Sequence, residues 1–176
     1  DIRFWCLGNE MDGPWQICKK TAAEYGRIAV EAGKVMKWVD PSIEVSSCGS
    51  SARSMPTFAA WEYEVLEHTL DVTDFVSLHM YYENPHNDVF EFLSWVEIMD
   101  RYIRETVAVC DAVAAKRKSS KRIMLCFDEW NVWYKNQEVD GHWEHAPHLI
   151  EEVYNLEDAL VVAQWLNVFL RRCDVL

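Results

Sequence analysis

Four short apolar runs alternate with longer segments of helical period, and this alternation restricts the fold more than any other feature of the sequence. The runs lie at residues 3–9, 43–48, 75–81 and 122–128. Helical patterns follow them at residues 21–38, 57–69, 89–117 and 155–173. Runs that are apolar on both faces are typical of buried parallel strands, and parallel strands need crossover helices. The order therefore predicts an α/β fold with a parallel sheet covered by helices.

The ends of the predicted helices carry recognisable signals. A capping-box pattern opens the first helix at Thr21, and Asp40-Pro41 ends that helix. Val175-Leu176 reads as the start of a further strand. The spacing of the last helix predicts that five of its residues face the core: Leu156, Ala159, Leu160, Ala163 and Leu166.

Two architectures fit this order of elements, a doubly wound open sheet and the eight-stranded (β/α)8 or TIM barrel. No glycine-rich phosphate loop follows any of the predicted strands, which favours the barrel. A complete barrel needs about 250 residues. The chain has 176 residues and no internal linker. We therefore expect one unit, residues 1–176, that forms part of a (β/α)8 barrel.

The charge of the chain restricts its partners. With 29 acidic and 17 basic residues, its formal net charge is −12. Such a field repels phosphate backbones and anionic lipid surfaces, so the composition argues against nucleic acid and against membranes as partners. No apolar run approaches the ~20 residues of a membrane-spanning helix.

The cysteines indicate a reducing compartment. Six are present, without the short paired spacing of zinc sites or redox dithiols. Several lie inside apolar runs, as Cys126 does, which favours burial as small hydrophobic side chains over a disulfide framework. We therefore expect a cytoplasmic protein. The sequence does not begin with methionine, so a removed secretion signal stays open as an alternative.

Two glutamates end predicted strands that are three units apart. In a barrel of this kind the reacting groups lie at the carboxyl ends of the strands. Glu10 follows the first strand and Glu129 the fourth, which places them across the barrel mouth from each other. Glycoside hydrolysis needs two such carboxylates, one protonated to release the leaving oxygen and one ionised to attack or to activate water. Glu10 alone would also fit a solvated loop; the pair favours catalysis.

Other polar residues at the strand ends suit the same pocket. Asn9 adjoins Glu10, and both can face one site only if the strand bulges or turns at Gly8. His79 and Tyr81 alternate on the third strand, so they share one face. Each of the two also fits a packing role. Their position nevertheless supports one shared pocket.

The segment 134–154 has neither helical nor strand period, and we expect a loop that covers the cleft. It holds His142, His145 and His148, which could suggest a metal site. Pro147 makes helical placement on one face doubtful, and no further ligand group is evident. We therefore expect no metal.

Four motifs occur in a characteristic order. The first is Gly8-Asn9-Glu10-Met11-Asp12-Gly13-Pro14-Trp15-Gln16, and the others are the segments 77–82, 128–134 and 154–160. Together they resemble the family 51 glycoside hydrolases, the α-L-arabinofuranosidases. The resemblance spans the chain, from the family's fourth barrel strand to the threshold of its eighth. It implies the C-terminal half of the catalytic barrel, with the other strands and a β-sandwich domain absent from this sequence.

The resemblance implies a retaining hydrolase that releases terminal non-reducing α-L-arabinofuranosyl residues from arabinose-containing polysaccharides and oligosaccharides. Glu10 matches the general acid/base and Glu129 the nucleophile. Asn9 would bind the sugar 2-hydroxyl, and Tyr81 would orient Glu129. No metal ion or organic cofactor is required, and the intact protein is expected to be a homo-oligomer. Two further residues would line the arabinose subsite: His79 and Trp133.

Two other interpretations stay open. The first is another retaining barrel glycosidase acting on xylosides or glucans, against which the run 129–133 argues. The second is a carbohydrate-binding fragment without activity, because half a barrel exposes unpaired strand edges and an open core face. On the same ground we expect the 176-residue chain alone to be inactive and the intact protein to be the enzyme.

Overall fold

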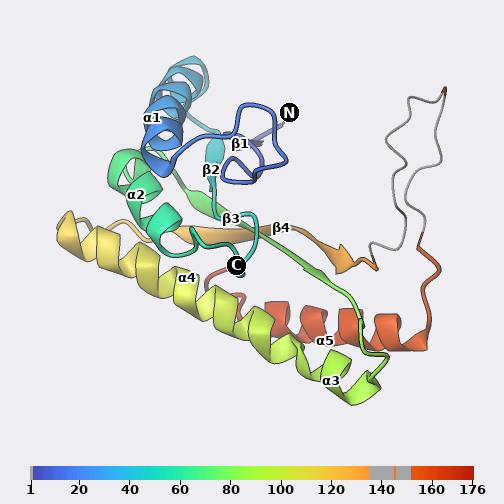
Figure 1. The fold of residues 1–176 in the computed structure, drawn as a ribbon. Coiled ribbons are helices and arrows are strands. Elements are labelled where there is room, and N and C mark those ends of the chain that lie inside the picture. Colours follow the sequence, from blue (N-terminus) through green and yellow to red (C-terminus); the bar gives the residue numbers. More distant parts are fainter. Residues whose placement is uncertain (1, 135–144, 146–151) are drawn as a thin grey trace.

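The computed structural model describes residues 2–134, 145 and 152–176. Its centre is a curled sheet of four parallel strands in the order β1-β2-β3-β4 (Figure 1). The strands are β1 (Phe4–Cys6), β2 (Glu44–Cys48), β3 (Phe75–Tyr82) and β4 (Met124–Val132). The predicted parallel α/β fold is confirmed, and each strand lies beside its neighbour in sequence, as in a barrel wall.

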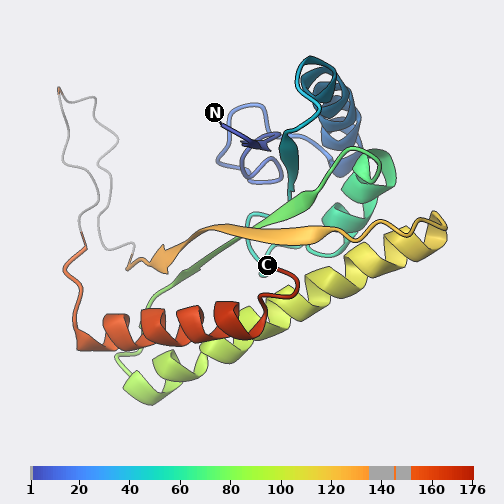
Figure 2. The ribbon, with the colours of Figure 1, turned by 180° about the vertical axis from the view of Figure 1, so that it is seen from behind.

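The helices wrap around one side of this sheet (Figures 1 and 2). They are α1 (Ala22–Val39), α2 (Ala60–Thr69), α3 (Val89–Ser94), α4 (Val96–Lys116) and α5 (Leu156–Arg171). Helix α1 packs against α2, α2 against α4, and α4 against α5. The main core lies between the helices and the sheet, where it includes Leu66, Leu78, Met99 and Trp165. No helix in the described part of the chain is long and apolar enough to cross a membrane.

Local signals in the sequence set the helix boundaries. The capping box at Thr21 is present, since the amide of Glu24 donates to the Thr21 hydroxyl and the Thr21 amide to the Glu24 carboxylate. The predicted helix 89–117 is divided in two at Trp95. There the Trp95 amide bonds to Phe92 three residues back, and its carbonyl accepts the Tyr82 hydroxyl at 2.7 Å.

The first strand differs from its prediction. Only three of the residues 3–9 form β1, and all three are exposed, Phe4 to 60%. The prediction of a buried strand is therefore wrong here. The physical reason is that β1 is the edge of the described sheet and has a strand partner, β2, on one side only.

Helix α5 turns a different face to the core than the one predicted. Its buried residues are Asp158, Val161, Trp165 and Val168. The five residues expected to face inward are all exposed, Leu156 to 75%. Apolar residues occupy two stripes of this helix, so spacing alone could not choose between them. The choice follows from Trp165, whose ring packs 4.9 Å from Tyr82 and 5.6 Å from Trp130 between centroids.

Strand β4 is longer than predicted, because its pairing with β3 continues through Val132. Glu129 therefore lies inside the strand and does not end it. At the chain terminus no further strand is formed, yet the carbonyl of Val175 accepts the Leu125 amide at 2.7 Å. Val175 thus occupies the open side of β4, where the sequence predicted a next strand.

All six cysteines are free, and their burial differs from the expectation. Cys48 and Cys110 are buried and Cys126 is partly buried, whereas Cys6, Cys18 and Cys173 are exposed. The exposed three lie on the edge strand, in a loop and beyond the end of α5. Burial within apolar runs was therefore predicted correctly only for the inner elements of the fold.

We predict that Gly49→Ala destabilises the protein by about 1–3 kcal/mol, the usual cost of overpacking. A Cβ atom at Gly49 would lie 2.3 Å from the backbone oxygen of Ser77, which cannot move without breaking the pairing of β2 with β3. The measurement is chemical denaturation of the intact protein that contains this chain.

Gly33→Ala in α1 is the matched control. Its Cβ would meet a methyl group of Val72 at 3.1 Å, which side-chain movement can relieve, and alanine is the better helix former. We expect a smaller loss of stability, or none. Equal losses for the two variants would contradict the role given to the close approach at Gly49.

Candidate active site

A strained turn after β1 positions Glu10 at the site. Gly8 has φ 142°, and Glu10 itself lies in the left-handed region with φ 46°. The Gly13 amide closes the turn on the Glu10 carbonyl at 2.8 Å. A Cβ atom at Gly8 would also lie 3.0 Å from the Met11 side chain. The turn expected at Gly8 is present, and it aims the Glu10 carboxylate back over the sheet.

An irregularity between β3 and β4 positions Glu129. Ser77 pairs with Cys126, but His79 pairs with Glu129, so β4 contains one extra residue between these pairs. The Tyr81 hydroxyl donates to Glu129 Oε1 at 2.9 Å. Burial and this hydrogen bond raise the pKa of Tyr81, so its hydroxyl remains a donor. His79 and Tyr81 both reach Glu129, as their alternation on one strand face predicts.

His79 lies between the two glutamates. Its Nδ1 is 3.1 Å from Glu10 Oε1 and 3.6 Å from Glu129 Oε2, and its Nε2 is 3.3 Å from Asp128 Oδ1. Its side chain is 4% exposed. Burial lowers the pKa of His79, but hydrogen bonds to Asp128 and Glu10 and the charge of Glu129 outweigh that effect and raise it to about 9. A protonated imidazole therefore separates two carboxylates that would otherwise repel.

The two glutamates face one cavity of about 560 Å³. Oxygen atoms of Glu10 and Glu129 lie within 4.8 Å of each other. The side chain of Glu129 is 38% exposed and that of Glu10 12%, so both are open to the cavity. The described lining consists of Glu10, Trp15, Ser51, Ala52, Ser54, Tyr81, Glu129 and Trp133. Aromatic rings beside polar groups suit a sugar, which has apolar faces and hydroxyl edges.

Side chains of the same loop hold Glu10 from the outer side. The Trp15 indole N–H donates to Glu10 Oε2 at 2.6 Å, and the Gln16 amide approaches the same oxygen at 3.3 Å. Glu10 Oε1 is the oxygen that faces His79. The two oxygens of Glu10 therefore have different partners, one at the cavity rim and one beneath it.

The remaining predicted site residues differ in their position relative to the cavity. Trp133 lines the cavity and packs edge-on against Tyr81 at 5.2 Å between ring centroids. His79 lies behind the carboxylates and is not among the lining residues. Asn9 is exposed on the turn and also lies outside that lining. Most of the loop expected at 134–154, with His142 and His148, lies outside the described residues; His145 is exposed.

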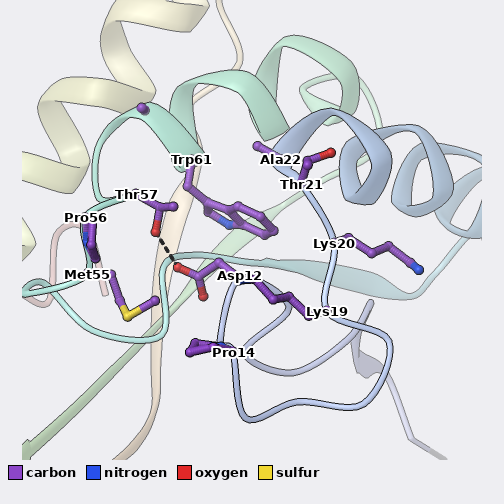
Figure 3. A pocket seen from close by; sticks show the side chains of 11 residues that line it. Asp12, Pro14, Lys19, Lys20, Thr21, Ala22, Met55, Pro56, Thr57 and Trp61 are labelled. Carbon is purple, nitrogen blue, oxygen red and sulfur yellow. Dashed lines mark hydrogen bonds between the residues drawn. The ribbon is translucent and has the colours of Figure 1, made fainter.

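Sequence reasoning missed Asp12, which joins two loops of the site. This buried carboxylate accepts hydrogen bonds from the Ser51 amide at 3.0 Å, the Ser51 hydroxyl and the Thr57 hydroxyl at 2.7 Å. Figure 3 shows it pointing toward Thr57. Asp12 thereby ties the loop that carries Glu10 to the loop that supplies Ser51 to the cavity. Its position just before a Gly-Pro turn was the available signal.

Glu62 in α2 was missed as well. It is buried and accepts the amides of Ser50 at 2.6 Å and Ala59 at 2.8 Å, the two ends of the loop after β2. Burial raises the pKa of Glu62, and the hydrogen bond donated by the Ser50 amide opposes that rise. In the sequence Glu62 reads as an ordinary helix residue, so no local pattern could have identified it.

Asp12 also lines a second hollow, of about 550 Å³ (Figure 3). Trp61, Met55 and Pro14 make most of it apolar, and Lys19 lies at its edge. Of the described residues that line it, Asp12 is the one carboxylate, and its oxygens are engaged with Ser51 and Thr57. The described lining of this hollow lacks a carboxylate pair, so the first cavity is the candidate active site.

The two glutamates of the first cavity, together with the histidine behind them, could also hold a cation. Glu10, His79 and Glu129 each present a ligand-type atom, and these atoms lie within 4.8 Å of one another. Carboxylates and imidazole bind divalent metals, so this cluster is the metal-compatible group in the described part of the chain. The same geometry serves a carboxylate pair held by a histidine.

Comparison with known proteins identifies the family of the chain. A model of the alpha-L-arabinofuranosidase C-terminal domain matches residues 128–176. The intracellular exo-alpha-(1->5)-L-arabinofuranosidase of Halalkalibacterium halodurans is 54% identical over 99% of this chain and 35% of its own length. A solved family 51 alpha-L-arabinofuranosidase from Bifidobacterium longum matches with a TM-score of 0.92 and 36% identity, over 100% of this chain and 37% of its own. The chain belongs to glycoside hydrolase family 51.

Two further similar proteins are also named arabinofuranosidases. An intracellular exo-alpha-(1->5)-L-arabinofuranosidase of Bacillus subtilis is 52% identical over 98% of this chain and 35% of its own length. An alpha-L-arabinofuranosidase from Thermotoga maritima, solved with arabinose, matches with a TM-score of 0.79 at 30% identity. The chain therefore spans about a third of the length of the curated relatives it matches, and its curled parallel sheet is that family's half-barrel.

We predict that Asp12→Ala in the intact protein lowers stability by about 1–3 kcal/mol, because donors of Ser51 and Thr57 lose a buried acceptor. The loop 9–20 should also become sensitive to proteolysis. Denaturation midpoints and limited proteolysis measure the two effects.

Asp71→Ala is the matched control. Asp71 is 73% exposed and pairs with Arg117 at 2.9 Å, the kind of surface ion pair that contributes between zero and about 1 kcal/mol. We expect little change in either measurement. If Asp71→Ala matched Asp12→Ala in both, the buried carboxylate would not be the link between the loops.

Proposed function

We propose that the protein containing this chain is a retaining α-L-arabinofuranosidase that releases terminal non-reducing arabinofuranosyl residues. The observation that carries the proposal is the carboxylate pair, with oxygen atoms of Glu10 and Glu129 within 4.8 Å. Retaining glycosidases hold their carboxyl groups about 5–5.5 Å apart, whereas inverting enzymes leave about 6.5–9.5 Å for a water molecule. Because the chain spans a third of its relatives, the activity is assigned to the longer protein.

The surroundings of the two glutamates support their separate roles. Glu129 accepts the Tyr81 hydroxyl and is the more exposed of the pair, as a nucleophile that must reach the anomeric carbon requires. Glu10 lies at the rim beside Trp15, where a leaving-group oxygen would emerge from the cavity. We therefore assign the nucleophile to Glu129 and the general acid/base to Glu10.

The proposed reaction has two displacements. Glu129 attacks the anomeric carbon while Glu10 transfers its proton to the departing glycosidic oxygen, which leaves a covalent arabinosyl-enzyme and an ionised Glu10. Glu10 then removes a proton from water, the water oxygen attacks the same carbon, and Glu129 is released. After the second displacement Glu10 is protonated and Glu129 is ionised again, so the enzyme returns to its starting state.

The substrate proposal rests on the cavity and on the relatives' names. Relatives named exo-alpha-(1->5)-L-arabinofuranosidases favour terminal arabinofuranosyl groups. The rings of Trp133 and Trp15 offer apolar surfaces for a sugar ring and its neighbour. We assign His79 to support of the pair from beneath. Asn9 is assigned to the sugar 2-hydroxyl, a contact that requires the exposed turn to close on the substrate.

The proposal extends to the whole protein. We assign β1 to β4 to strands four to seven of a (β/α)8 barrel, with Val175 at the threshold of the eighth, and residues 1–176 to the C-terminal half of that barrel. Two of the relatives are named intracellular, and the six free cysteines fit a reducing compartment, which supports a cytoplasmic location. A homo-oligomer remains a prediction. Without the longer protein the chain is expected to be inactive, since Phe4 of β1 and Leu156 of α5 leave apolar surface exposed.

The nearest alternative keeps the mechanism and changes the sugar. A xylosidase or glucosidase would use the same carboxylate pair, and a panel of aryl glycosides separates these activities from one another. The family membership favours the arabinofuranoside. A carbohydrate-binding protein without activity would not need both glutamates at this spacing.

We predict that Glu129→Gln in the intact protein lowers kcat for 4-nitrophenyl α-L-arabinofuranoside by roughly 10³-fold or more. Glu10→Ala should lower turnover by about 10²–10⁴-fold. Azide should partly restore turnover, because it replaces water as the nucleophile and, unlike water, needs no general base. The product with azide should be the α-L-arabinofuranosyl azide, because two displacements retain configuration.

Glu91→Gln serves as control for these variants. Glu91 lies in α3, bonded to His86 and away from the cavity lining, so its loss should leave kcat unchanged. An inverted azide product would contradict the retaining assignment. Full activity in either active-site variant would contradict the assignment of the pair.

We predict that removal of divalent cations leaves activity unchanged. In the proposed reaction Glu10, His79 and Glu129 act as carboxylates around a histidine, and no step needs a Lewis acid. Dialysis against EDTA followed by kinetics at fixed pH tests this. A loss of activity that zinc or manganese restores would show that the cluster holds a catalytic metal.

A further inference from the structure

Asp128 is a carboxylate of the site that the proposed reaction does not yet use. On a regular strand neighbouring side chains point to opposite faces, so Asp128 and Glu129 should not share a partner. The extra residue in β4 between the pairs Ser77–Cys126 and His79–Glu129 removes this restriction. As a result, both carboxylates reach the imidazole of His79.

The contacts of Asp128 place it behind the cavity. Its Oδ1 lies 3.3 Å from His79 Nε2, and its Oδ2 accepts the thiol of Cys6 at 3.6 Å. Asp128 is not among the residues that line the cavity. It therefore touches the machinery through His79 and does not touch the substrate.

This contact determines what the other nitrogen of His79 can do. An ionised Asp128 accepts a hydrogen bond, so it keeps the proton of His79 on Nε2. In the charged imidazole Nδ1 carries a proton as well, and it can donate at 3.1 Å to Glu10 Oε1, which remains an acceptor whether Glu10 is ionised or protonated on its other oxygen. A general acid/base alternates between these two forms in each reaction cycle.

We propose that Asp128 is a positioning residue for the acid/base step: it holds the Nε2 proton of His79, so that Nδ1 remains bonded to Glu10 in both protonation states of that glutamate. The inference rests on the proposed glycosidase function and adds a residue to it. Its specific consequence is that Asp128 matters for proton transfer to the leaving group and little for the attack by Glu129.

The test is Asp128→Asn in the intact protein, assayed with two substrates. An asparagine keeps the size of Asp128 but removes its negative charge, so the charged imidazole loses the partner that holds its Nε2 proton; the orienting aspartate of a serine protease fails in a comparable way when it is changed to asparagine. Arabinobiose has a poor leaving group that needs a proton. The 2,4-dinitrophenyl arabinofuranoside has one that does not. For each, kcat/KM reports the first displacement.

We expect kcat/KM for arabinobiose to fall about tenfold or more, a fraction of the 10²–10⁴-fold that general acid catalysis contributes. For the dinitrophenyl substrate we expect a change of less than about threefold. A larger but equal fall for both substrates, or no fall for either, overturns the inference. An intact protein that hydrolyses neither substrate overturns the proposed function and this inference with it.

Cys6→Ala is the matched control, since it removes the other partner of Asp128 and keeps His79. It should leave the ratio of the two kcat/KM values unchanged. If Cys6→Ala changed the ratio as much as Asp128→Asn does, local packing would explain the effect and the inference would fail.

If Asp128→Asn does not fold, a measurement on the intact protein without this substitution still tests the inference. Nitrogen-15 NMR of the histidine side chains, assigned with a His79 variant, reports which ring nitrogen carries a proton. We expect both ring nitrogens of His79 to be protonated throughout the pH range in which the enzyme is active. A ring that loses either proton in that range overturns the inference.

Discussion

The contact of one imidazole with three carboxylates is the interaction on which the site depends. Glu10, Glu129 and Asp128 all lie within 3.6 Å of a ring nitrogen of His79. Without a positive charge between them these groups would repel, and some would leave the cavity or take up protons. Burial lowers the pKa of His79, but hydrogen bonds and nearby charges outweigh burial and raise it to about 9. Relative to a free imidazole, this shift favours the charged form by roughly 3 kcal/mol. The carboxylate pair can therefore exist at close range because the histidine lies beneath it.

Backbone irregularities produce this convergence. The positive φ values of Gly8 and Glu10 turn the chain back over β1, and the extra residue in β4 brings Asp128 to the same side as Glu129. Regular strands would have placed one member of each adjacent pair outside the site. Strain of this kind persists where surrounding contacts over-determine the conformation. Here the hydrogen bonds of Asp12 to the neighbouring loop supply such contacts.

The sequence was sufficient for the features that depend on period and on local caps, and insufficient for those that depend on packing. Alternation predicted the parallel sheet, and Thr21 predicted the start of α1. Strand order also predicted that Glu10 and Glu129 would face each other across one cleft, although Glu129 lies inside β4. The buried face of α5 could not be predicted, because Trp165 selects it through rings on other elements. Asp128 was invisible for a similar reason, since strict alternation assigns it to the face opposite Glu129.

The site and the stability of the chain draw on different parts of the structure. The contacts described for Glu10, His79 and Glu129 come from the sheet strands and from the loop after β1, so the geometry of the pair is specified within this region. The apolar residues that remain exposed, such as Phe4 on β1 and Leu156 on α5, make none of these contacts. Surfaces that cover them would add free energy of folding without moving the carboxylates. In the proposed enzyme a small set of strand-end contacts would therefore fix the chemistry, while the choice of substrate would depend on the loops around them, of which 10–20 and 50–57 contribute to the described wall.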